Sequence, residues 1–319
     1  MNIRLKIAVG EYPHTAAVRN GSIPIEGVDP EFVTVQPQIA AFRRMVRHLE
    51  FDVCELAPTT YIIARAYEAA FKALPIFLMR RFHHAGLLVR PDAGIKKPND
   101  LEGKKVGVRA YSVTTGVWTR GILANEFGLD CSKVAWVVDD EEHVTHLQLP
   151  PNVIRTTDGQ SLAHMMANGE LAAGFQGNAG IGRSGSPLAG WKTEEVTYPD
   201  LFPNAAELEA EWFDRTRIYP THGTIVVKDS LLAVYPWIGK SIFEAFSRAK
   251  NQWLERLDAN GSPENKRYSA LCKIVGDDPL PYGLAPNLTT IKALEEFAFQ
   301  QGLTPGRISV DELFVDPEK

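Results

Sequence analysis

Apolar positions along this chain follow two different periods, and segments of the two kinds alternate. Apolar and charged residues alternate over Ile3–Val9, which predicts a half-buried strand. The largely apolar segments Phe51–Leu56 and Ala73–Leu78 predict two further strands. Between them, apolar residues recur at helical spacing over Ile39–Leu49. Strands and helices that alternate in this way indicate an α/β protein with largely parallel sheets.

The same reasoning predicts the remaining elements. Further strands are expected at Glu31–Val35, Ala85–Val89, Lys105–Arg109, Lys133–Val138, Ala172–Gln176 and Gly223–Val227. Further helices are expected at Pro58–Ala70, Thr114–Phe127, Ser161–Asn168, Ala205–Arg215, Trp237–Leu257 and Leu288–Gln301.

Two breaks in this pattern suggest a second lobe inserted into the first. The polar, Pro-rich stretch Pro91–Pro98 and the Gly/Ser-rich stretch Gly177–Gly190 both read as loops between lobes. We therefore expect residues 1–91 and 192–319 to form lobe I and residues 92–191 to form lobe II. Two chain crossings between lobes imply a hinge and a ligand-binding cleft.

Composition excludes several classes of function. The net charge of −5 and the absence of a basic patch argue against a nucleic-acid partner. No apolar run approaches the roughly 20 residues that span a bilayer, and the first residues lack the apolar core of a secretory signal. Cys54, Cys131 and Cys272 are odd in number and widely spaced, which predicts reduced thiols and a cytoplasmic protein.

Hydroxyl residues mark two helix starts that can hold an anion. A buried strand ending at Arg109 leads into Ser112, Thr114 and Thr115, which open the next helix. Thr59 and Thr60 take the equivalent place in lobe I. Such hydroxyls either cap the first turn or leave its N–H groups free for a carboxylate or phosphate. We weigh the second interpretation because the pattern occurs in both lobes.

The order of elements resembles the type II periplasmic-binding-protein fold, a two-lobed α/β fold with a ligand cleft between the lobes. The segments that carry this likeness are Ile25–Val28, Phe42–Leu56, Pro98–Val108 and Met166–Ala173. Within that superfamily the chain resembles the 4,5-dihydroxyphthalate decarboxylases along nearly its whole length. The supporting segments are Arg80–His84, Val117–Gly128, Tyr219–Val227, Pro281–Asn287, Gln301–Leu303 and Asp311–Phe314.

This resemblance implies a decarboxylase of a hydroxylated aromatic carboxylic acid that works without oxidation and requires no cofactor. The expected partner is a small aromatic carboxylate, and self-association stays open. The chain departs from the family pattern at His14, His83 and Asn178, where basic residues are usual. Because Arg binds a carboxylate bidentately and His or Asn does not, the substrate is expected to carry one carboxylate rather than two.

The chemistry requires a proton donor and an anion anchor. Histidine suits proton transfer, and His14, His84 and His222 lie next to predicted strand ends, where ligands of α/β sheets bind. Each has an alternative interpretation as a surface or core histidine. Arg80 is the expected carboxylate anchor, unless it pairs with a structural acid.

Other residues receive weaker assignments. Tyr12 and Tyr111 lie in predicted loops and can stack on an aromatic ring, and Asn178 can reach the ligand. The run Asp139–His146 contains metal-ligand types, so Glu142, His143 and His146 are candidates for a divalent ion, although a solvated loop is the favoured interpretation. No metal is required by the proposed chemistry.

Two other functions compete with the decarboxylase. A solute-binding protein that captures a small carboxylate for a transporter would use the same fold and anchors, but ordinarily needs export. An enzyme of the menaquinone pathway would also share the fold and would take a larger substrate. Turnover and ligand size distinguish the three.

Overall fold

The computed structural model of the chain describes residues 2–157, 160–184, 192–258 and 261–317. Contacts within the chain divide it into two units, which we describe separately. The first comprises Met1–Arg81, Phe213–Ala293 and Ile308–Lys319, and the second comprises Phe82–Trp212 and Leu294–Arg307. The end of the Gly/Ser-rich stretch, residues 185–190, lies outside the described residues.

The first unit is built on a five-stranded sheet. Its strands are β1 (Ile3–Ala8), β2 (Val28–Phe32), β3 (Val53–Leu56), β4 (Phe71–Arg80) and β12 (Thr221–Lys228), in the order β2-β1-β3-β12-β4. The strands β2, β1 and β3 are parallel, whereas β12 runs antiparallel to both β3 and β4. One reversed strand therefore lies inside an otherwise parallel sheet.

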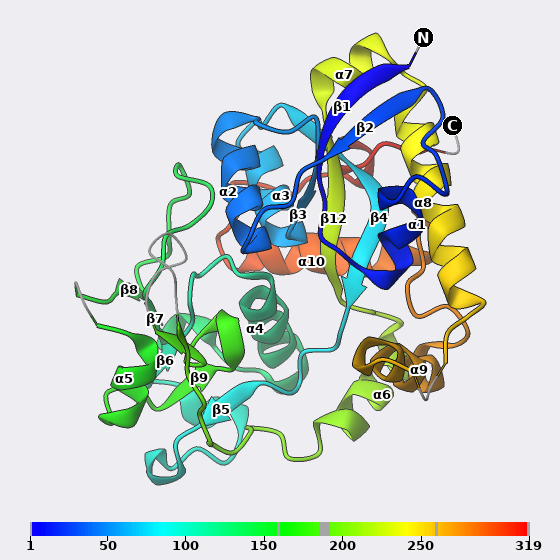
Figure 1. The fold of residues 1–319 in the computed structure, drawn as a ribbon. Coiled ribbons are helices and arrows are strands. Elements are labelled where there is room, and N and C mark those ends of the chain that lie inside the picture. Colours follow the sequence, from blue (N-terminus) through cyan, green and yellow to red (C-terminus); the bar gives the residue numbers. More distant parts are fainter. Residues whose placement is uncertain (1, 158–159, 185–191, 259–260, 318–319) are drawn as a thin grey trace. The chain divides into compact units, whose positions relative to one another are not determined.

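Helices cover both faces of this sheet (Figure 1). The helices α2 (Gln38–His48) and α3 (Pro58–Ala66) lie on one side, and α1 (Ala16–Arg19) and α8 (Ile238–Leu254) lie on the other. This arrangement explains why β3 and β4 are largely apolar, because a strand covered on both faces buries nearly every side chain. The core contains Ile7, Leu74, Ile76, Leu78, Ile225 and Val227, packed against Ile242 and Phe246 of α8.

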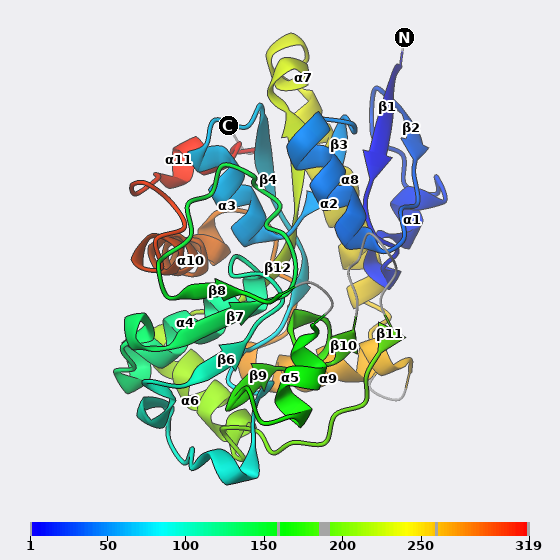
Figure 2. The ribbon, with the colours of Figure 1, turned by 90° about the vertical axis from the view of Figure 1, so that its left-hand side faces the viewer.

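The second unit contains its own five-stranded sheet. The strands are β5 (Leu87–Val89), β6 (Lys105–Gly107), β7 (Ala135–Val138), β8 (Val153–Arg155) and β9 (Ala173–Phe175), in the order β5-β9-β6-β7-β8. All are parallel except β5, which pairs with β9 in the antiparallel sense. The helices α4 (Thr114–Phe127) and α5 (Leu162–Ala167) lie on opposite sides of this sheet (Figure 2).

A short piece of chain from the C-terminal region completes the second unit. Phe297 packs edge-on against Trp118 of α4, with ring centroids 5.7 Å apart. The absence of a side chain at Gly121 permits this close packing, because a Cβ at this position would lie 2.1 Å from the Phe297 ring. Buried Arg120 donates from Nε to Oε1 of Gln301 at 2.7 Å and fixes the same segment.

The remaining elements connect and flank these sheets. The helices are α6 (Ala205–Thr216), α7 (Asp229–Val234), α9 (Pro263–Val275), α10 (Leu288–Gln300) and α11 (Val310–Leu313), and β10 (Arg183–Ser184) pairs with β11 (Lys192–Thr193). Within the described residues, no helix is both long enough and apolar enough to cross a membrane.

The structure divides the chain at places other than residues 91 and 192. The expected strand Ala85–Val89 was assigned to lobe I, but β5 pairs with β9 of the second sheet. The segment near residue 200 belongs there too, since the Val89 N–H donates to the Pro199 carbonyl and the Leu201 N–H donates to the Leu87 carbonyl, each at 2.8 Å. Both expected boundaries therefore fall within the second unit.

Candidate functional site

Polar residues of the first unit gather at one edge of its sheet. Ligands of open α/β sheets bind at the carboxyl ends of parallel strands. Tyr12 follows β1, Thr59 and Thr60 follow β3, and Arg81 follows β4. Because β12 is antiparallel, its first residues, including His222, lie at this same edge.

A buried carboxyl group, that of Glu55 on β3, lies at the centre of this edge. The side chain is 2% exposed. The Gly10 N–H donates to Oε2 at 2.9 Å, and the Tyr12 hydroxyl donates to Oε1 at 2.8 Å. Burial raises the pKa of Glu55, and these two hydrogen bonds oppose the rise. Burial and the neighbouring carboxylate also raise the pKa of Tyr12.

Two glycines leave the space that this carboxyl group fills. A Cβ on Gly10 would lie 3.0 Å from Oε2 of Glu55, and a Cβ on Gly223 would lie 2.8 Å from Oε1. Gly223 also has a φ of +68°, in the left-handed region that favours glycine, just before an irregularity in the pairing of β12 with β4. The backbone therefore encloses the Glu55 side chain closely.

Tyr12 is partly exposed, in contrast to Glu55. It lines a solvent-open groove of about 520 Å³ together with Glu11, Pro13, Ala16, Arg19 and Asn20. Its ring stacks on His14, with centroids 5.2 Å apart.

His14 is enclosed by aromatic rings. It has no exposed surface, and its ring centroid lies 5.5 Å from that of Trp253 and 6.5 Å from that of Tyr268. Within the described residues, neither ring nitrogen makes a well-formed hydrogen bond. Burial, with added repulsion from Arg267, lowers the pKa of His14 to about 3. The imidazole is therefore neutral at pH 7.

His222 and Arg81 lie together at the start of β12. Arg81 is exposed and donates from Nε to Nε2 of His222 at 3.4 Å, which assigns the imidazole proton to Nδ1. Burial and the positive charges of Arg81 and Arg267 lower the pKa of His222. Arg81 keeps exposed surface, but partial desolvation of its guanidinium, together with the charge of Arg267, likewise lowers its pKa. The positive charge of Arg267 therefore acts on both His222 and Arg81.

Arg80 is not placed to anchor a ligand. Its side chain has no exposed surface and donates to the carbonyls of Tyr219 (2.6 Å) and Pro281 (3.1 Å) and to Oδ1 of Asn287. Its guanidinium also lies 5.0 Å from the ring centroids of Phe77 and Tyr219. Burial lowers its pKa to about 10. The predicted anchor is a structural cation, held by carbonyl and amide oxygens rather than by an acid.

The two predicted helix starts do not have the expected caps. The residues before the first turns of α3 and α4 are Ala57 and Val113, and neither gives a side-chain cap. Thr59, Thr60 and Thr114 are buried within the first turns. These threonines therefore lie inside the helices and do not occupy the N-cap position.

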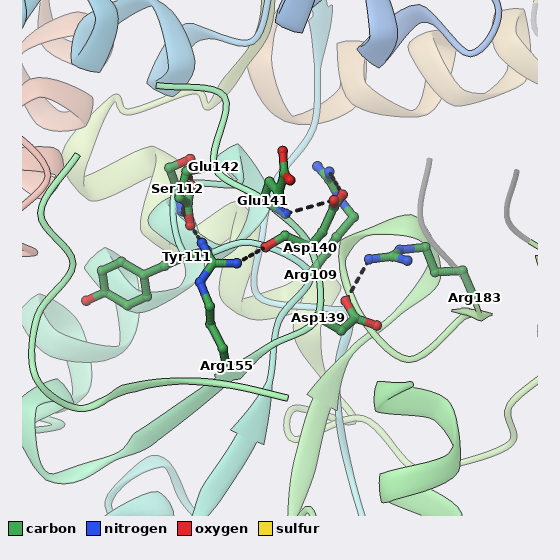
Figure 3. Close-up of polar contacts among 9 residues, drawn as sticks. All are labelled: Arg109, Tyr111, Ser112, Asp139, Asp140, Glu141, Glu142, Arg155 and Arg183. Carbon is green, nitrogen blue, oxygen red and sulfur yellow. Dashed lines mark hydrogen bonds and ion pairs between the residues drawn. The ribbon is translucent and has the colours of Figure 1, made fainter. Parts of the chain in front are cut away.

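The second unit also has a polar edge, at the carboxyl ends of β6 and β7 (Figure 3). Arg109 follows β6 and pairs with Asp140 at 3.1 Å, and Arg183 of β10 pairs with Asp139 at 2.7 Å. All four side chains are buried. Burial raises the pKa of Asp139 to about 6, against the opposing effect of Arg183.

The acidic run 139–146 is not the solvated loop that we favoured. Glu142 accepts hydrogen bonds from the Tyr111 N–H (2.7 Å), the Ser112 N–H and the Ser112 hydroxyl. His143 is buried beside it, whereas His146 is exposed. In the described part of the chain, no three His, Cys, Asp or Glu residues are grouped to hold a metal ion. Glu142, His143 and His146 therefore do not form a metal-binding group in the described part of the chain.

The remaining predicted residues of the second unit have different surroundings. The ring of Tyr111 lies 3.9 Å from the Arg120 guanidinium, and its side chain is buried. Asn178 is exposed, in the single turn Gly177–Ala179 after β9. His84 is buried against Trp212 and Phe202, with ring centroids 5.4 and 6.3 Å away, and burial lowers its pKa to about 4.

Several polar residues at these two edges were not selected from the sequence. They are Glu55, Arg109, Asp139, Asp140 and Arg183. Three of them carry a recognisable signal, because Arg109, Asp139 and Asp140 are charged residues that directly follow apolar strands. Glu55 lies inside an apolar strand, and an acid in that position is itself unusual.

Comparisons with known proteins place the chain among relatives. No family model matches it. A 4,5-dihydroxyphthalate decarboxylase of Comamonas testosteroni is 30% identical over 327 residues, which cover 98% of the chain and 96% of that protein. A 4,5-dihydroxyphthalate decarboxylase of Pseudomonas putida is 36% identical over 179 residues, which cover 54% of the chain and 69% of that protein.

Solved structures establish the fold. The periplasmic aliphatic sulphonate-binding protein SsuA of Escherichia coli has a TM-score of 0.55 at 12% identity, with 98% of each chain covered. The desulfurization enzyme DszB has a TM-score of 0.50 at 13% identity, with 99% of this chain and 97% of that chain covered. The expected two-lobed α/β fold of the periplasmic-binding-protein type is confirmed. Because both a binding protein and an enzyme have it, the fold alone does not decide the function.

Proposed function

Because the chain belongs to the 4,5-dihydroxyphthalate decarboxylase family, we propose that it decarboxylates a hydroxylated aromatic carboxylic acid without oxidation. The observation that carries this proposal is the similarity to the Comamonas testosteroni protein, which extends over 98% of this chain and 96% of that relative. A similarity of this extent includes both polar edges described above.

The reaction sets simple chemical requirements. The bond between the ring and its carboxylate breaks, its electron pair stays on the ring carbon, and a proton is added there as CO₂ leaves. The protein must therefore hold the acid in one orientation, supply a proton and accept a hydrogen bond from the ring hydroxyl. Side chains can meet all three requirements, and we propose that no organic cofactor takes part.

We propose Arg81 in place of Arg80 as an anchor for the substrate carboxylate. Arg81 is exposed at the end of β4, and the positive field of Arg267 adds to its own charge. Arg109 and Arg183 of the second unit already pair with carboxylates. One anchoring guanidinium is enough for a substrate that carries one carboxylate.

The histidines fit the part of hydrogen-bond acceptors rather than proton donors. His14, His84 and His222 all have lowered pKa values because of burial, so each is neutral at pH 7. A neutral imidazole with a lowered pKa can accept a hydrogen bond from a ring hydroxyl, but it is a poor general acid and resists taking up a proton. Proton donation then passes to a carboxyl group whose pKa is raised, and Glu55 and Asp139 are the candidates.

The setting of the reaction is also part of the proposal. The three cysteines are free thiols, which suits a reducing compartment such as the cytoplasm. The expected partner is the small aromatic acid itself.

A substrate panel tests the proposed function. Purified protein is incubated with hydroxybenzoates and hydroxyphthalates, with and without a chelator, and CO₂ release is measured. We expect turnover of at least one hydroxybenzoate that the chelator does not suppress. Tight binding of an intact acid without CO₂ release would instead support a solute-binding protein and contradict the proposal.

A further inference from the structure

The Glu55 carboxyl group combines deep burial with neutral partners. Its two oxygens accept from the Gly10 N–H and the Tyr12 hydroxyl. Among the described residues, no Lys, Arg or His forms an ion pair with it. A buried carboxylate without a counter-charge is strongly disfavoured, so the group is most stable as a neutral acid, and in that form its O–H donates to the Tyr12 oxygen across the same contact. Glu55 therefore differs from Asp139 and Asp140, each of which has an arginine partner.

The surrounding backbone isolates this acid from water on two sides. The close approaches of Gly10 and Gly223 leave no room for even a methyl group between backbone and carboxyl oxygens. The Tyr12 side chain is the contact of Glu55 that reaches toward solvent, since Tyr12 is partly exposed and lines the open groove. A phenol can donate a proton on one side and receive one on the other. It is therefore a suitable path into and out of an enclosed acid.

We propose that Glu55 stores the proton consumed in the reaction and delivers it through the hydroxyl of Tyr12. This inference rests on the proposed decarboxylase function and assigns its proton path. This account places the Tyr12 oxygen against the reacting ring, which makes Tyr12 the catalytic residue. Glu55 acts through Tyr12.

The proton transfers balance in a single turnover. The C–C bond to the carboxylate breaks, and its electron pair takes the Tyr12 hydroxyl proton to form the new C–H bond. The Tyr12 oxygen recovers a proton from the Glu55 carboxyl group, which becomes a carboxylate. After CO₂ leaves, solvent returns a proton to Glu55 by the same route. No electron acceptor or donor is involved.

Glu55→Gln tests the storage step, because the amide keeps the size of Glu55 and an acceptor oxygen for the Gly10 N–H, and its NH2 group can donate to the Tyr12 oxygen as the protonated acid does, but it holds no transferable proton. We expect kcat to fall by about 10²-fold to 10⁴-fold with little change in KM, because Tyr12 can no longer be resupplied with the proton that it delivers as general acid. Wild-type kcat should fall at high pH as Glu55 ionises, and this alkaline limb should be absent from the residual activity of the variant. Tyr12→Phe should show the same loss, and the double variant should lose no more than either single variant.

Asp52→Asn is the matched control. Asp52 lies at the opposite end of β3 and pairs with Lys228 at 2.9 Å, away from the candidate site. This variant should keep the wild-type kcat and pH profile. Circular dichroism and thermal unfolding establish that all variants fold.

Infrared spectroscopy of the resting protein separates this inference from the proposed function. A carbonyl stretch of a protonated carboxyl group at pH 7, shifted in D₂O and lost in Glu55→Gln, supports proton storage. Absence of that band overturns the inference, whether or not the protein turns over any acid. Turnover by wild type together with unchanged kcat in Glu55→Gln overturns it as well. A wild-type protein inactive on the whole panel, with the band present, contradicts the proposed function instead.

Discussion

Arg80 and Arg81 are neighbours in the sequence but have different surroundings. Arg80 has no exposed surface, and its guanidinium binds two carbonyls and an amide oxygen, whereas Arg81 is exposed at the sheet edge. The sequence identifies the arginine pair, but the member predicted as the anchor, Arg80, is the one that the structure buries. Which of the two side chains turns inward depends on where β4 ends and on its pairing with β12. Because β12 lies about 140 residues later in the chain, the local sequence does not reveal this register.

We expect substitutions of these two arginines to separate stability from binding. Arg80→Met leaves buried carbonyls without a donor and should lower the free energy of unfolding by roughly 3 kcal/mol or more. Arg81→Met should change it by less than about 1 kcal/mol, but should raise KM by about tenfold to 100-fold through loss of a charge-assisted hydrogen bond. Urea unfolding and steady-state kinetics on both variants provide the measurements. Equal losses of stability would contradict the assignment.

The histidines show a second limit of sequence reasoning. Their positions beside strand ends identified them as candidates for proton donors. Their protonation depends on packing, since Trp253 and Tyr268 surround His14 and Trp212 lies against His84. These contacts come from distant parts of the chain, so the sequence around each histidine does not contain them.

At the scale of elements, local signals predicted most helices and strands. Thr114–Phe127 was expected as a helix, and α4 has these bounds. The expected strand Glu31–Val35 begins three residues late, because β2 (Val28–Phe32) includes Asp29 and Pro30 at an exposed edge. The short edge strand β8 and the helix α9 were not predicted. Both have weak apolar patterns, since all three β8 residues are at least partly exposed and Tyr268 is the one buried residue of α9.

Helix α4 depends on a glycine that intrinsic helix propensity disfavours. Gly→Ala in a helix normally stabilises by up to about 1 kcal/mol. In Gly121→Ala the added Cβ would overlap the Phe297 ring, so we expect a loss of roughly 1–3 kcal/mol instead. Thermal unfolding of the variant measures this effect.

Gly239→Ala in α8 is the control for that substitution. A Cβ there meets no atom closer than 3.3 Å, so this variant should stay within about 1 kcal/mol of wild type. Equal stability of the two variants would show that Phe297 yields easily and does not lock the C-terminal segment onto α4.

At the scale of the whole molecule, both units contain buried histidines that resist protonation. The folded-state pKa is about 3 for His14 and about 4 for His84, below the ordinary value of 6.5. The unfolded chain therefore binds these protons first. The stabilisation is fully present above about pH 6.5 and is lost as the pH falls toward 4. Glu55 and Asp139, with raised pKa values, act in the opposite direction.

We expect His84→Phe to flatten this acid response. Relative to the variant, wild type should lose on the order of 3 kcal/mol of unfolding free energy between pH 7 and pH 4. The comparison cancels the acidic groups common to both proteins. Urea unfolding at several pH values checks it, and substitution of exposed His48 should leave the response unchanged. Parallel pH curves for wild type and His84→Phe would refute the prediction.

The position of β12 has a consequence for how the protein is made. Within the first sheet, β3 and β4 are joined only through β12, which begins at Thr221. During synthesis, two apolar strands emerge from the ribosome long before the strand that bridges them. Until more than 220 residues have been translated, their inner edges lack hydrogen-bond partners and are open to mispairing. A nascent chain of this protein should therefore need protection by a chaperone over most of its length, and any truncation before Lys228 should aggregate rather than yield a smaller folded unit.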